Sequence, residues 1–126
     1  IKYSYIRDSD VLTDADRIYY DRILSWNMSD SDATSAIHQM SDYLQRYYGK
    51  KVIILLDEYD TPMQEAYVNG FWDELVAFTR SMFNAAFKTN PWLARGIMTG
   101  ITRVSKESIF SDIKSKLIFS SDVPPK

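Results

Sequence analysis

The feature that most constrains the fold is a run of five apolar residues, Val52–Leu56, which ends abruptly in Asp57 and Glu58. The run shows no polar alternation, which is typical of a β-strand covered on both faces, as in a parallel sheet. Ligands of parallel sheets bind beyond the carboxyl ends of the strands. The sequence therefore predicts a buried strand over residues 52–57 whose terminal acids lie where a ligand can bind.

A second strand is predicted over residues 94–99, and a long helix with one broad apolar side over residues 71–89 precedes it. Thr61 and Gln64 resemble a helix cap, with Pro62 at the first helical position. A strand, a helical crossover and a second strand make a βαβ unit, which builds a parallel sheet. The polar residues that follow the second strand are therefore expected at the same sheet edge as the two acids; they include Thr99 and Arg103.

The segment before the first strand is predicted to be helical over residues 14–48. Thr13 has the type and position of an N-cap, and Gly49 stands where a helix end favours a residue that tolerates positive φ. The inner faces of these helices are predicted to carry Ile18, Ile23, Trp26, Ile37, Met40, Leu44 and Tyr47. A further helix or strand is expected over residues 105–120.

Composition limits the classes of function. The chain has 126 residues, of which 45% are hydrophobic, so it can form one unit with a core. Its net charge of −2 gives no basic excess for nucleic-acid binding. No apolar run approaches the roughly 20 residues of a membrane-spanning helix. We therefore expect no membrane partner and no direct nucleic-acid binding. The absence of cysteine fits a reducing, cytoplasmic setting.

An apolar strand that ends in two acids is the Walker B pattern of nucleotide sites. The first acid, Asp57, suits a hydrated Mg²⁺, and the second, Glu58, suits a group that orients or deprotonates an attacking water. In a plainer alternative the two acids only terminate a strand, and Asp60 or Thr61 caps the next helix. His38 is the only histidine, and we expect it to be an ordinary helix residue.

A metal-dependent nuclease is a further alternative, because Asp112 and Lys114 have the acid-x-lysine spacing of restriction-type cores. The upstream acid and the hairpin that such a core needs are not evident in the sequence. A charged helix or loop is the favoured interpretation of this segment.

Two long segments resemble the bacterial AAA-ATPase-like family. They are YGKKVIILLDEYDTP at residues 48–62 and MTGITRVSKESIFS at residues 98–111. The resemblance extends from about residue 16 to about residue 119. It implies an α/β fold that is a partial P-loop NTPase (AAA-like) core, in which helices flank parallel strands.

The resemblance also implies ATP and Mg²⁺ as ligands. By position, Asp57 matches the acid that binds the metal, Glu58 the catalytic acid, and Thr99 the polar sensor that contacts the γ-phosphate or its water. Arg103 falls where a cation could reach phosphate oxygens. A solvated arginine, or an ion pair with Glu107, explains Arg103 equally well.

The departure from the family is the missing Walker A strand, loop and helix, since no segment matches G-x-x-x-x-G-K-[ST]. We therefore interpret residues 1–126 as one fragment of an ATPase domain. The parent protein is expected to hydrolyse Mg-ATP, and the isolated fragment is expected to be inactive. An alternative is a non-catalytic scaffold derived from a degenerate ATPase core. A homodimer through an exposed sheet edge is also expected.

Overall fold

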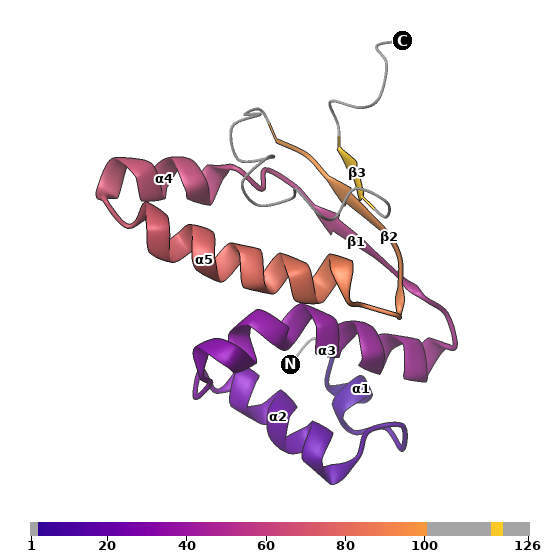
Figure 1. The fold of residues 1–126 in the computed structure, drawn as a ribbon. Helices are drawn as coiled ribbons and strands as arrows, with labels where there is room; N and C mark the ends of the chain where they lie inside the picture. The colour runs from indigo at the N-terminus through magenta and orange to yellow at the C-terminus, as the bar shows by residue number, and fades with distance from the viewer. Residues whose placement is uncertain (1–2, 101–116, 120–126) are drawn as a thin grey trace.

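The two predicted strands form, and they pair in parallel. The computed structural model describes residues 3–100 and 117–119. Strand β1 (Val52–Leu56) pairs with β2 (Leu93–Met98), which pairs in turn with β3 (Leu117–Phe119). Figure 1 shows the three strands side by side, with α5 and α3 below them. The prediction of an α/β fold with parallel strands and flanking helices is confirmed.

The crossover between β1 and β2 consists of three helical elements. They are α4 (Thr61–Asn69), α5 (Trp72–Phe83) and the π-helix η1 (Asn84–Lys88). Gly70 separates α4 from α5 and adopts a φ of 82°, which a residue without a Cβ tolerates. The predicted cap around Thr61 is wrong, because Thr61 is already helical and the cap position is Asp60, whose side chain makes no capping hydrogen bond.

The N-terminal half is helical, as predicted. It contains α1 (Ser4–Arg7), α2 (Asp14–Leu24) and α3 (Asp30–Tyr48). Thr13 and Asp16 form a capping box at the start of α2, so the predicted cap is confirmed. Gly49 ends α3 with a φ of 67°. Among the described residues no helix combines the length and apolar character needed to span a membrane.

The inner face predicted for α2 is partly wrong. Ile18 is 62% exposed and Trp26 is 84% exposed, whereas Tyr20 is buried. Tyr20 belongs to a small core that joins α1, α2 and α3, together with Ile6, Leu12 and Tyr43. The Tyr20 ring buries a large apolar surface while its hydroxyl donates to the Tyr3 carbonyl at 3.4 Å, and an aliphatic pattern does not reveal such a residue.

The main core lies between the sheet and the helices on one side of it (Figure 1). Its buried members come mainly from α4, α5, η1, β2 and β3, and include Met63, Val76, Phe83, Phe87, Leu93, Met98 and Leu117. The half-buried side chains of β1 pack against them. Ile37 of α3 packs against this core, so α3 connects it to the smaller helical core.

The prediction that the first strand is covered on both faces is wrong for the described residues. Burial alternates along β1: Val52, Ile54 and Leu56 are half-buried, but Ile53 is 61% exposed and Leu55 is 72% exposed. The described helices pack on one face of the sheet only, so the other face lacks cover within this part of the chain (Figure 1).

Several predictions fall on residues outside the described part of the chain. These are the roles of Arg103 and of the Asp112 and Lys114 pair, and most of the element predicted over residues 105–120. Within that range the structure describes only β3.

Candidate functional site

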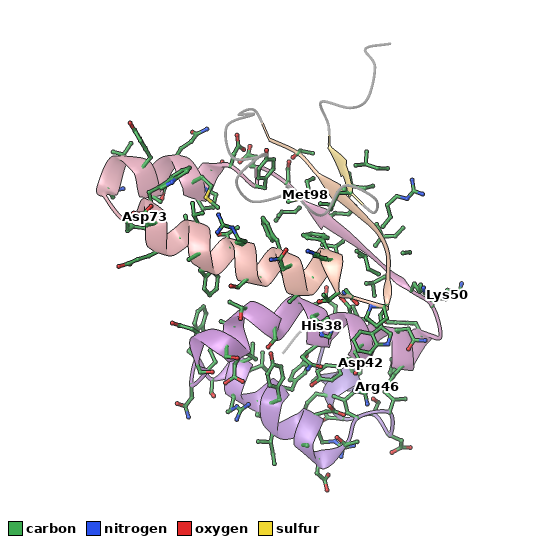
Figure 2. All side chains as sticks on the ribbon, viewed as in Figure 1. His38, Asp42, Arg46, Lys50, Asp73 and Met98 are labelled. Atoms are coloured by element: carbon green, nitrogen blue, oxygen red, sulfur yellow. The ribbon has the colours of Figure 1, made fainter. Side chains whose placement is uncertain are left out.

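The carboxyl ends of β1 and β2 lie side by side, as a parallel pairing requires. Leu56 is opposite Met98 in the register, and Figure 2 labels Met98 at this end of the sheet and Lys50 at the other. Backbone pairing continues beyond the strands. The Thr99 N–H donates to the Leu56 carbonyl at 2.9 Å, and the Tyr59 N–H donates to the Thr99 carbonyl at 3.0 Å. These bonds fix the segment that carries both acids against the end of β2.

Thr99 connects the two acidic residues through one hydroxyl group. The Oγ1 of Thr99 donates to the Asp57 carboxylate and accepts the Glu58 backbone N–H at 3.0 Å. A threonine hydroxyl has one proton and two acceptor lone pairs, so both contacts can form at once. The structure thus brings together three of the four predicted site residues, from positions about forty residues apart in the chain.

Glu58 has an uncommon backbone conformation, with a φ of 50°. The left-handed region costs a non-glycine residue roughly 1–2 kcal/mol. The hydrogen bonds that Thr99 makes with Glu58 and with the adjacent Tyr59 hold the chain in this turn. Such strain is concentrated at functional sites, although the sequence Asp-Glu carries no signal of it.

Three neighbouring residues complete the site, and the sequence analysis assigned none of them to it. Tyr59 is buried, and Asp60 is only 3% exposed. A Cβ on Gly100 would lie 2.5 Å from a Tyr59 ring carbon and 2.8 Å from Asp60 Oδ1. Gly100 therefore allows the end of β2 to approach the Tyr59–Asp60 turn closely. A glycine directly after a predicted strand was the available signal for this contact.

The side chains of Asp57 and Glu58 belong to exposed residues, so a hydrated cation could reach them. No group of three or more potential metal ligands occurs in residues 3–100 and 117–119. Mg²⁺ needs fewer, because it keeps several waters and binds one or two carboxylates together with substrate phosphates. The two exposed acids are thus compatible with Mg²⁺.

An apolar cavity lies elsewhere in the described structure. It has a volume of about 470 Å³ and is bounded by α2, α3 and the first three residues of β1, at the opposite end of that strand from Asp57. The His38 ring packs edge-on against the ring of Trp92, with the centroids 5.0 Å apart. This agrees with the expectation that His38 is an ordinary helix residue.

Comparison with known proteins identifies the family of this chain. The family model described as "Predicted AAA-ATPase" matches residues 6–110. No curated protein and no solved structure gives a significant match. The family match covers most of the chain and includes both strand ends described above. The chain therefore belongs to the AAA-ATPase-like family.

Proposed function

We propose that Asp57, Glu58 and Thr99 form the acidic half of a Mg-ATP site. The observation that carries this proposal is the Thr99 hydroxyl, which contacts the carboxylate of one acid and the backbone of the other. A carboxylate held in this way at the end of a rigid strand is positioned before any ligand binds. We also propose that the core of this chain is of the P-loop NTPase type.

Each residue has a distinct role. Asp57 would hold a hydrated Mg²⁺, which would supply neutralisation of charge on the phosphate oxygens. Glu58 orients the attacking water and accepts its proton. The single proton of the Thr99 hydroxyl is directed at Asp57, so we assign Thr99 a positioning role toward this carboxylate in place of the γ-phosphate contact expected of a sensor.

The site needs a phosphate-binding loop that this sequence does not contain. Backbone N–H groups and a lysine of such a loop supply most of the binding energy for the triphosphate. We therefore expect this chain alone to bind Mg-ATP weakly and not to hydrolyse it. Turnover is expected only where these residues are joined to an intact loop.

The test is the Glu58→Gln variant of a protein that contains this segment together with a phosphate-binding loop. We expect ATP binding to be retained and hydrolysis to fall by at least about a hundredfold, the range typical of a lost general base. Glu65→Gln, which changes an exposed acid of α4, is the matched control and should leave turnover unchanged. Normal hydrolysis by the Glu58→Gln variant would refute the assignment and favour the non-catalytic scaffold.

A further inference from the structure

Gly100 lies where the end of β2 meets the turn that follows β1. A Cβ at this position would lie 2.5 Å and 2.8 Å from two ring carbons of Tyr59, and 2.8 Å from Oδ1 of Asp60. Carbon atoms prefer separations of about 3.5–4.0 Å. Every residue other than glycine has a Cβ, so any of them at position 100 would have to separate the two segments by about 1 Å.

The two residues that Gly100 meets belong to a turn that is held in place. Tyr59 and Asp60 are both buried, and Tyr59 is a member of the main core. The Thr61 N–H donates to the Glu58 carbonyl at 3.1 Å, which closes the turn. Because buried groups are closely packed, a side chain at position 100 would displace the end of β2 or the whole turn.

The start of α4 does not explain why the Asp60 side chain is buried. Asp60 occupies the cap position, but its side chain makes no capping hydrogen bond. Its Oδ1 lies instead beside the α-carbon of Gly100, within 2.8 Å of the place that a Cβ would take. The carboxylate of Asp60 is therefore part of the surface against which the end of β2 rests.

This contact bears on the nucleotide site because Thr99 directly precedes Gly100. The Thr99 hydroxyl accepts from the Glu58 N–H at 3.0 Å and donates to the Asp57 carboxylate. The Thr99 carbonyl accepts from the Tyr59 N–H at 3.0 Å. Hydrogen bonds with an N–H donor extend to about 3.2 Å. A separation of the two segments by about 1 Å would therefore break such bonds.

From these distances we propose that Gly100 is a positioning residue of the nucleotide site. The absence of a side chain at position 100 allows the end of β2 to rest against Tyr59 and Asp60. This contact keeps the Thr99 hydroxyl within hydrogen-bonding distance of the two acids of the site. The effect of the contact on hydrolysis rests on the proposed function, whereas the contact itself can be measured in this chain without a nucleotide.

The first experiment is amide hydrogen exchange of this chain, followed by NMR, in Gly100→Ala. The amides of Tyr59 and Thr99 report the pairing beyond the strands, and the amide of Tyr43 in α3 reports global unfolding. We expect the Tyr59 and Thr99 amides to exchange at least about tenfold faster relative to Tyr43, because several hydrogen bonds weaken together. Gly70→Ala is the control, since its Cβ meets no atom within 4 Å, and it should leave this ratio unchanged. An unchanged ratio in Gly100→Ala would overturn the proposal.

Second substitutions show whether crowding is the cause. Tyr59→Val removes both ring carbons that the new Cβ would meet, whereas Tyr59→Phe keeps them. In the Gly100→Ala background, Tyr59→Val should therefore slow the exchange of the Thr99 amide again relative to Tyr43. The recovery should be partial, because Oδ1 of Asp60 remains. Equal recovery in Tyr59→Phe, or none in Tyr59→Val, would contradict the proposed contact.

The effect on hydrolysis is measured in a protein that joins this segment to a phosphate-binding loop. Gly100→Ala should lower kcat by about a hundredfold, since a misplacement of about 1 Å is sufficient for a loss of this size. The KM for ATP should stay almost unchanged, because the loop supplies most of the binding. Adding Tyr59→Val should restore part of kcat, and adding Tyr59→Phe should not.

The outcomes separate the role of Gly100 from the proposed function. If Glu58→Gln stops turnover but Gly100→Ala leaves kcat unchanged, the role of Gly100 is refuted and the proposed function stands. If Glu58→Gln hydrolyses ATP normally, the proposed function is refuted. The exchange ratio of the Thr99 amide then decides by itself whether Gly100 positions the end of β2.

Discussion

Replacing Gly96 with alanine is predicted to destabilise the fold by crowding the centre of the sheet. Gly96 lies in the middle of β2, opposite Ile54 of β1 and Leu117 of β3. A Cβ at this position would lie 2.6 Å from Cδ2 of Leu117 and 2.8 Å from Cε1 of Phe87. Carbon atoms prefer separations of about 3.5–4.0 Å, so a neighbour must move by roughly 1 Å.

Neither neighbour moves freely. Both are buried, and the Phe87 ring also packs edge-on against Phe83 with the centroids 5.6 Å apart. Overpacking of this kind costs about 1–3 kcal/mol, and the gain from replacing a strand glycine by alanine offsets about 0.5–1 kcal/mol. We therefore expect Gly96→Ala to lower the free energy of unfolding by about 1–2 kcal/mol in urea titrations followed by circular dichroism.

A double-mutant cycle identifies the cause. Phe87→Leu removes ring atoms that the new Cβ would meet, so Gly96→Ala should cost about 1 kcal/mol less in that background. Gly70→Ala is the control. It meets no atom within 4 Å but has a φ of 82°, so its cost comes from the backbone and should not depend on Phe87. An unchanged stability in Gly96→Ala, or a cost independent of Phe87, would refute the crowding argument.

Three further predictions concern charge and the strand ends. Burial alone would raise the pKa of Asp16, but hydrogen bonds from Arg46 and Thr13 outweigh it and lower the pKa from 3.8 to about 2. The ionised form thus stabilises the fold above pH 3.8, and this contribution is lost as the pH falls through about 2. In Asp16→Asn, the free energy of unfolding should therefore depend less on pH between 3.8 and about 2 than in the wild type. Thr99→Val should cost about 1 kcal/mol in thermal unfolding, because it removes the hydroxyl contacts with Asp57 and Glu58. Glu58→Gly should raise the unfolding free energy by about 1 kcal/mol, because it relieves the left-handed backbone. Three results would each contradict the corresponding prediction. They are an unchanged pH dependence of unfolding in Asp16→Asn, an unchanged stability of Thr99→Val, and a lower stability of Glu58→Gly.

Local signals in the sequence were sufficient for the strands β1 and β2 and for the ends of α2 and α3. The capping box at Thr13 and the terminal Gly49 act within a few residues, so their type and spacing define the ends of helices. The parallel pairing of β1 with β2 follows from the helical crossover between them. It also places Thr99 beside Asp57, which the structure shows.

Features that depend on distant residues could not be predicted in this way. An apolar run does not reveal which segment covers each face, so the exposure of Ile53 and Leu55 was missed. The turn at Glu58 depends on hydrogen bonds from Thr99, forty-one positions away. The burial of Asp60 against Gly100 likewise needs the end of β2 in place. The sequence alone indicated only the helix-cap position, which Asp60 also occupies.

Binding of a divalent cation by Asp57 at the end of β1, as we propose, can be measured in a Mn²⁺ titration of this chain followed by NMR. Mn²⁺ stands in for Mg²⁺ and broadens the resonances of nearby amides. We expect the amides of Asp57, Glu58 and Thr99 to broaden at the lowest Mn²⁺ concentration. This effect should disappear in Asp57→Asn and persist in Asp73→Asn, which changes an exposed acid in the first turn of α5. Broadening that survives in Asp57→Asn, or that affects all exposed acids equally, would contradict the claim.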